Sequence, residues 1–134
     1  MTVARRMLET HPVGIDIDAD ALTRCIDECV DCAQACTACA DACLAEETVV
    51  HLRRCITLCL NCADICDTTG RVVSRVTEWE SEVARVALEA CARSRELCAA
   101  ECDKHAKMGM KHCEVCEGAC QRCEQACRAL LAVL

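Results

Sequence analysis

Cysteine is the residue type with the greatest capacity for chemistry in this sequence, because it occurs 18 times among 134 residues. A chain this rich in cysteine usually carries disulfides or metal. The thiols form four clusters: Cys25, Cys29, Cys32, Cys36, Cys39 and Cys43; Cys55, Cys59, Cys62 and Cys66; Cys91, Cys98 and Cys102; and Cys113, Cys116, Cys120, Cys123 and Cys127. Thiolate is a soft ligand that selects Cu(I), zinc and iron–sulfur clusters, so we expect all 18 to be metal ligands.

The N-terminal sequence argues against a secreted disulfide scaffold. Arg5 and Arg6 are followed by Pro12 and several aspartates, with no apolar stretch long enough for a signal peptide. We therefore expect a cytoplasmic protein, in which thiols stay reduced and are available for metal. The chain contains no run of 18 apolar residues, so we expect no membrane association. Its net charge of -7 speaks against nucleic acid as a partner.

Charge favours multiple Cu(I) ions over other metals. Thiolates gathered in a dry core need compensating cations, and one monovalent ion per bridging thiolate gives neutrality. Zinc surrounded by four sulfurs retains excess negative charge unless most thiolates bridge. The alternative to copper is therefore a metallothionein-like zinc-binding protein in which most thiolates bridge. The cysteine spacing of iron–sulfur proteins is absent. No exposed, low-pKa cysteine can be identified, so we expect no catalytic residues and no enzymatic activity.

The cysteine spacing also predicts the elements that carry these thiols. Steps of four and three alternate, which places each cluster on one stripe of an α-helix, as at the core positions of a helical bundle. A lone cysteine there would be interpreted as packing, but leucine, isoleucine or valine would pack a bundle better than 18 cysteines. The fold class is therefore all-α, an antiparallel up-down-up-down four-helix bundle with a cysteine-lined core.

Helix boundaries follow from capping residues and from where the stripes stop. Asp18 is a candidate cap for the first long helix, and Thr77 with Glu80 predicts a capping box for the third. Residues 1–17 form an N-terminal segment with room for a short helix, and residues 18–134 form the bundle. We place the four long helices at about residues 18–45, 48–75, 77–106 and 112–133.

The two ends of the predicted bundle differ in chemistry. His51, His105, His112, Met108 and Met110 gather at one end and are candidate metal ligands of a mouth, although helix-end histidines are also commonly solvated or capping residues. At the other end the stripes continue as apolar residues such as Leu22, Val73, Leu88 and Leu130. Copper is therefore expected to pass in at the histidine end.

Two further features lie outside these stripes of thiols. Arg95 interrupts the stripe of the third helix at a position where a cysteine would fit, and charge compensation of neighbouring thiolates is the one role we assign to it. The second helix has another apolar face, formed by Val49, Leu52, Ile56, Leu60 and Ala63. We expect this face to bind another subunit.

Four segments are similar to the bacterial copper storage protein family, specifically its cytosolic branch. They are H-L-R-R-C at 51–55, C-A-D-I-C at 62–66, E-C-D-K-H at 101–105 and H-C-E-V-C-E-G-A-C-Q-R-C-E-Q-A-C at 112–127. The resemblance spans about residues 18–131. It implies a four-helix bundle that stores many Cu(I) ions along its core, usually in a homotetramer, with a His- or Met-bearing mouth. The partners expected are copper ions and a copper chaperone.

Overall fold

The computed structural model describes residues 2–134, and these residues form helices and short connections. In chain order the elements are α1 (Ala4–Glu9), α2 (Ala19–Leu44), the 3-10 turn η1 (Val49–His51), α3 (Arg53–Val73), α4 (Ser81–Ala106) and α5 (Lys111–Ala132). No strand occurs within residues 2–134. The predicted all-helical class with four long helices is confirmed.

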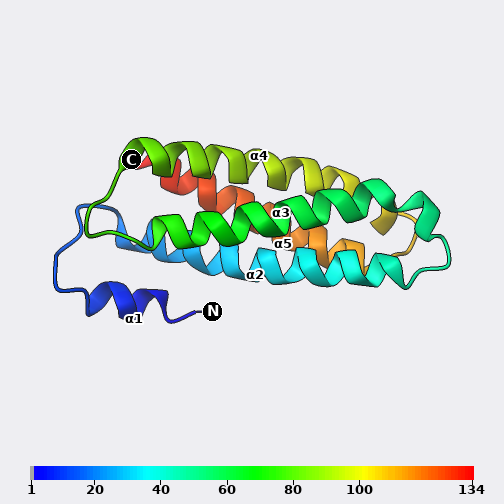
Figure 1. The fold of residues 1–134 in the computed structure, drawn as a ribbon, viewed down its shortest axis with the longest axis horizontal. Helices are drawn as coiled ribbons and strands as arrows, with labels where there is room; N and C mark the ends of the chain where they lie inside the picture. Colours follow the sequence, from blue (N-terminus) through cyan, green and yellow to red (C-terminus); the bar gives the residue numbers. More distant parts are fainter. Residues whose placement is uncertain (1) are drawn as a thin grey trace.

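The four long helices lie side by side along the long axis of the molecule (Figure 1). Each packs against two others, because α2 contacts α3 and α5, while α4 contacts α5 and α3. The helices therefore enclose one central core. No helix within residues 2–134 is long and apolar enough to cross a membrane.

The beginning of α2 follows the predicted capping, whereas α3 and α4 begin later than expected. The Asp18 carboxylate accepts a hydrogen bond from the Ala21 amide at 2.9 Å. The helix expected from residue 48 begins at Arg53, because Val49–His51 forms a 3-10 turn and Thr48 makes no side-chain cap. A chain that tightens into this turn can redirect itself before the next helix begins.

The predicted capping box at the start of α4 does not form. This helix begins at Ser81, and its N-cap Glu80 makes no side-chain capping bond. The Thr77 hydroxyl instead lies 3.2 Å from Nε2 of His11, a residue to which the sequence had given no role. The physical reason is that a long-range partner competes with the local capping bond for the same hydroxyl.

The N-terminal segment is tied to α2 by polar contacts. The Thr2 amide donates to the Asp27 carboxylate at 3.0 Å, and Arg5 donates to Asp20 at 2.6 Å. Figure 1 shows α1 alongside the first part of α2. This segment therefore covers the outside of the bundle near one end.

Apolar side chains close that end of the core. Leu22, Val73, Leu88 and Leu130 are fully buried and come from α2, α3, α4 and α5 respectively. In the same half, Gly70 lets α3 approach α2 closely, because an added Cβ would lie 3.3 Å from Cβ of Cys29. The apolar end predicted from the sequence is thus present in the packing.

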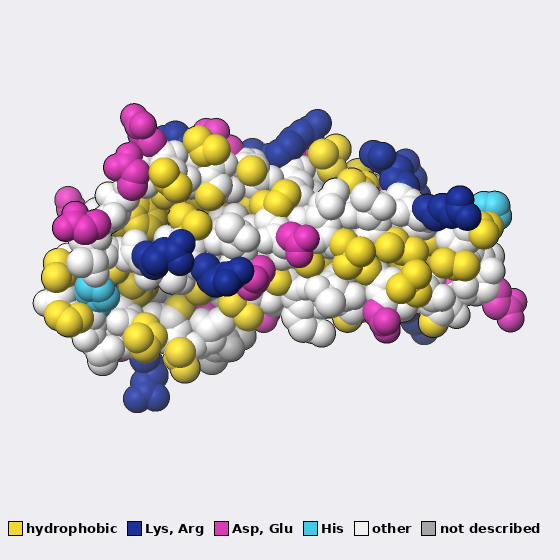
Figure 2. Space-filling view, in the orientation of Figure 1, with side chains coloured by type: hydrophobic (Ala, Val, Ile, Leu, Met, Phe, Trp, Pro, Cys, Tyr) yellow, Lys and Arg dark blue, Asp and Glu magenta, His cyan; other side chains and the backbone are white. Residues whose placement is uncertain are grey.

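The outer surface carries hydrophobic side chains as well as charges (Figure 2). Leu44, Val50 and Ile56 line a shallow depression where α2, η1 and α3 meet. Of the apolar face predicted on the second helix, Leu52 and Ala63 are buried in the core instead, and Leu60 remains exposed. That face is therefore narrower than the helical periodicity suggested.

Candidate metal centre

All 18 cysteines are free thiols and all are buried. The alternation of three and four residues places each cluster on the inward stripe of its helix, so thiols from different helices meet at matching depths. Sulfur–sulfur distances across the core include 3.7 Å between Cys59 and Cys98 and 3.3 Å between Cys66 and Cys123. The sulfur atoms therefore form a continuous column inside the bundle.

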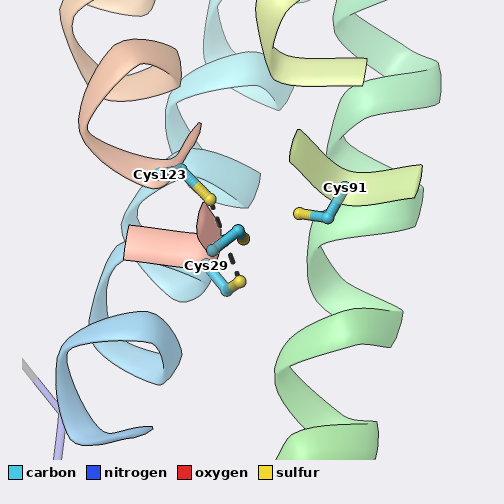
Figure 3. Close-up of side chains that lie close together, drawn as sticks. Cys29, Cys91 and Cys123 are labelled. Carbon is cyan, nitrogen blue, oxygen red and sulfur yellow. Dashed lines mark hydrogen bonds between the residues drawn. The ribbon is translucent and has the colours of Figure 1, made fainter. Parts of the chain in front are cut away.

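The column contains groups of four thiols whose sulfur atoms all lie within 4.8 Å of one another. These groups include Cys29, Cys91, Cys123 and Cys127 near the apolar end; Cys36, Cys98, Cys116 and Cys120 further along; and Cys39, Cys55, Cys59 and Cys102 toward the other end. Figure 3 shows Cys29, Cys91 and Cys123 extending toward one another from α2, α4 and α5. The sulfur atoms of Cys29 and Cys123 are 3.8 Å apart. Such groups can hold soft metal ions between helices.

Neighbouring groups share members, which makes bridging coordination geometrically available. Cys59 and Cys102 belong both to the group with Cys39 and Cys55 and to a group with Cys98 and Cys116. A sulfur atom that lies close to two sets of partners can bind two metal ions at once. The column can therefore hold a chain of linked ions instead of isolated sites.

Arg95 lies inside this column. The residue is fully buried, one guanidinium nitrogen donates to Sγ of Cys36 at 3.7 Å, and another donates to the backbone carbonyl of Cys62. Its Nε has no hydrogen-bond partner in the described part of the chain. The sequence marked this position as an interruption of the stripe, and the structure places a positive charge there among thiols.

Two thiols illustrate the interactions that a metal ion must replace, namely the thiol proton of Cys43 and the hydrogen bonds of Cys62. Burial raises the pKa of the Cys43 thiol to about 12, so metal binding at Cys43 releases a proton. The Cys62 thiol donates to the carbonyl oxygen of Ser94 at 2.9 Å, and the same sulfur lies 2.9 Å from the Ser94 hydroxyl. Cys62 is therefore held by hydrogen bonds to Ser94 of α4.

His112 is the histidine that the structure brings to the thiols. Its Nδ1 lies 3.5 Å from Sγ of Cys39 and 3.6 Å from Sγ of Cys113, and Cys43 completes a group of four possible ligands. Its Nε2 lies 3.0 Å from the Glu46 carboxylate. Burial lowers the pKa of His112, but hydrogen bonds with Cys39 and Glu46 outweigh burial and raise it overall.

His105 is buried and binds a carboxylate. Its Nε2 donates to Glu101 at 2.9 Å, and Glu101 also forms ion pairs with Arg54 and Lys104, each at 3.3 Å. Burial raises the pKa of Glu101, yet hydrogen bonds from His105 and Lys104 lower it overall. The contact of Glu101 with His105 was not predicted from the sequence, although their spacing of four residues on one helix was a readable signal.

The remaining candidates of the predicted mouth are more exposed. His51 lies in η1 with its side chain in solvent, and Met108 is 71% exposed. Met110 is half-buried and packs against the edge of the core. The structure thus brings His112 directly into a thiol group and leaves His51 and Met108 at the surface.

Comparisons with known proteins agree with this geometry. The sequence profile of the copper storage protein family matches residues 18–132. The structure of the copper storage protein Ccsp from Streptomyces lividans, loaded with 10 copper equivalents, is 49% identical and covers 98% of this chain and 99% of that chain, with a TM-score of 0.95. No curated protein sequence matches the chain.

Two further structures of the Streptomyces lividans protein are similar to this chain. One, described as copper loading to a cytosolic copper storage protein with five coppers, is 53% identical and covers 86% of this chain and 95% of that chain, with a TM-score of 0.84. A histidine-to-alanine variant is 52% identical over 87% of this chain and 97% of that chain, with a TM-score of 0.85.

Proposed function

The chain belongs to the copper storage protein family, and we propose that it stores many Cu(I) ions as thiolate complexes inside the bundle. The family is one of storage proteins and not of enzymes. Each of the 18 cysteines serves as a ligand in this proposal, and thiolates shared between neighbouring groups bridge successive ions. Copper is the cargo of the protein, so capacity is the property that the fold must provide.

The buried column of thiols is the observation that carries this proposal. A structural core would use larger apolar side chains at these positions, whereas here thiols from α2, α3, α4 and α5 meet at distances of 3.3 to 4.0 Å. Thiolate selects soft ions, and monovalent ions at one per bridging thiolate neutralise a column that divalent ions in separate four-sulfur sites would leave negative. Cu(I) satisfies both requirements.

We propose that copper passes in at the end that carries His112. This imidazole and the thiols of Cys39, Cys43 and Cys113 offer the first ligands, while His51, His105, Met108 and Met110 are proposed to assist ions at the same end. Leu22 and Leu130 block the opposite end with buried apolar side chains. A cation would lose its hydration at that end without gaining a ligand, so passage there is unfavourable.

The antiparallel, up-down-up-down order of the helices is part of the proposal. In Figure 1 the colour runs from blue to cyan along α2 toward one end and returns through green along α3, which supports that order. It places the α2–α3 and α4–α5 connections together, so that Glu46 and His112 can meet. The cytosolic branch of the family, a homotetramer and delivery by a copper chaperone complete the proposal.

Titration of the reduced protein with Cu(I) under anaerobic conditions tests the function. We expect binding to saturate at roughly one ion per thiol, as charge neutrality requires. Zn(II) added to the loaded protein should displace little copper, whereas Cu(I) should displace zinc. Saturation at a handful of ions, or preferential retention of zinc, would contradict copper storage.

The mouth is tested separately from capacity. Replacing His105 and His112 with alanine should slow the uptake of Cu(I) or weaken the last ions bound, because the thiols that hold most ions remain. A matched change at His11, which lies in the N-terminal segment and contacts Thr77, should leave uptake unchanged. A large loss of capacity in the His105 and His112 variant would show that these residues belong to the store itself.

A further inference from the structure

The two ring nitrogens of His112 have different kinds of partner. Nε2 lies 3.0 Å from a carboxylate oxygen of Glu46, and Nδ1 lies 3.5 Å and 3.6 Å from the sulfur atoms of Cys39 and Cys113. An ionised carboxylate can accept hydrogen bonds but cannot donate them, whereas a metal-binding nitrogen needs a free lone pair. The two sides of the ring are thus suited to different tasks.

A neutral imidazole carries one N–H and one lone pair, on different nitrogens. Because Glu46 accepts the hydrogen at Nε2, the lone pair is fixed on Nδ1, which faces the thiols. Carboxylates that hold metal-binding histidines in this way also fix the orientation of the ring and raise its basicity as a ligand. Glu46 therefore has the geometry of a partner that prepares His112 for a metal ion.

Glu46 reaches His112 from a distant part of the chain. It follows Ala45, the C-cap of α2, and its backbone amide and carbonyl bond to Cys43 and Val49 in the turn that leads to η1. The Glu46 side chain is 35% exposed and that of His112 is 25% exposed. The contact therefore lies at the rim of the column, at the end where copper is proposed to enter.

We propose that Glu46 is a positioning residue for copper capture: it holds Nε2 of His112 so that Nδ1, together with Cys39, Cys43 and Cys113, receives the incoming Cu(I). This inference rests on the proposed copper storage function. Without Glu46 the ring samples both tautomers and other orientations, and capture slows. Loss of such a carboxylate typically reduces metal affinity or activity about 10- to 100-fold.

Neighbouring residues provide matched variants for the test. Glu46→Ala removes the acceptor, while Glu46→Gln keeps a carbonyl oxygen that can accept the Nε2 hydrogen. Glu47→Ala removes an exposed carboxylate at the next position of the same turn. His112→Ala removes the ring itself, and its combination with Glu46→Ala measures the coupling between the two residues.

Transfer of the first Cu(I) equivalent from a coloured Cu(I) chelate to each reduced variant gives the rate of capture. We expect Glu46→Ala and His112→Ala to be slower by about 10-fold or more, and the double variant to be no slower than His112→Ala. Glu46→Gln and Glu47→Ala should load at a rate close to wild type. Nitrogen-15 NMR of the copper-free proteins should show His112 protonated on Nε2 in wild type and as a mixture of tautomers in Glu46→Ala.

Each unfavourable outcome identifies what failed. Capture by Glu46→Ala at the wild-type rate, with full capacity retained, overturns the positioning role alone and leaves a structural contact between the α2–α3 turn and α5. Slow capture by Glu46→Gln also overturns it, since charge and not hydrogen bonding would then matter. Saturation of the wild-type protein at a handful of ions contradicts the storage function itself, whatever the variants do.

Discussion

Arg95→Met is the substitution that most directly tests how the core tolerates a buried charge. The guanidinium is fully buried, its Nε lacks a hydrogen-bond partner in the described chain, and the side chain to which it donates a hydrogen bond is the thiol of Cys36 at 3.7 Å. A neutral thiol compensates a full positive charge poorly. Methionine is an unbranched, flexible and uncharged side chain, so it can fill most of this space without the charge.

The expected effect is a gain in stability of the reduced, copper-free protein. Removal of the guanidinium forfeits its hydrogen bond to the Cys62 carbonyl, worth about 1.5–3 kcal/mol for a charged donor. It also relieves a desolvation penalty of several kcal/mol for a buried ion. The Cys62 carbonyl remains part of the backbone of α3. Replacing buried charged groups with apolar residues is often neutral or stabilising by about 1–4 kcal/mol, and we expect a gain in that range.

Urea unfolding of the reduced protein under anaerobic conditions measures this gain as a change in the midpoint at constant slope. Arg93→Met is the matched control, because Arg93 lies on the same helix but is exposed and pairs with Glu96 at 2.8 Å; its effect should stay within about 0.5 kcal/mol. Destabilisation of the copper-free Arg95→Met protein by more than about 1 kcal/mol would refute the reasoning, because Arg95 would then already have a thiolate partner.

Further predictions concern the apolar end, the helix cap and metal removal. Leu130→Ala should destabilise the protein by about 2–5 kcal/mol through the cavity it leaves, while Cu(I) titration gives unchanged capacity; reduced capacity would contradict a purely structural role for that end. Asp18→Ala should lose about 0.5–2 kcal/mol in urea unfolding, because Ala21 loses its capping partner, and an unchanged midpoint would show that the cap adds nothing. Removing copper with a strong chelator should lower the melting temperature by linkage but leave the helical circular dichroism signal unchanged; loss of that signal would mean that the metal is needed for folding.

The helical core could be predicted from the sequence because it depends on local periodicity. Steps of three and four residues place Cys29 and Cys36 on one helix face whatever the rest of the chain does, and burial of that face then brings partners such as Cys123 and Cys120 close. The cap at Asp18 is equally local. These features need only the geometry of a helix and the exclusion of apolar faces from water.

Contacts between distant side chains could not be predicted in the same way. The pairing of Thr77 with His11, which replaces a local capping box, depends on how the N-terminal segment lies against the bundle. Glu46 meets His112 across 66 residues of chain. Neither pair has a periodic signature, because each depends on where two turns come together after the helices have packed.

The sulfur–sulfur distances explain how such a bundle can take up metal without being rebuilt. Two thiolates that bind one tetrahedral metal ion at about 2.3 Å lie about 3.8 Å apart. The protein holds Cys25 and Cys127 at 3.9 Å and Cys32 and Cys120 at 3.7 Å. An ion can therefore replace thiol protons with little movement of the helices. Its binding free energy then adds to the stability of a fold that packing at the apolar end already maintains. A storage protein needs this separation of folding from binding, because a bundle that formed only around its metal would unfold each time the metal was released.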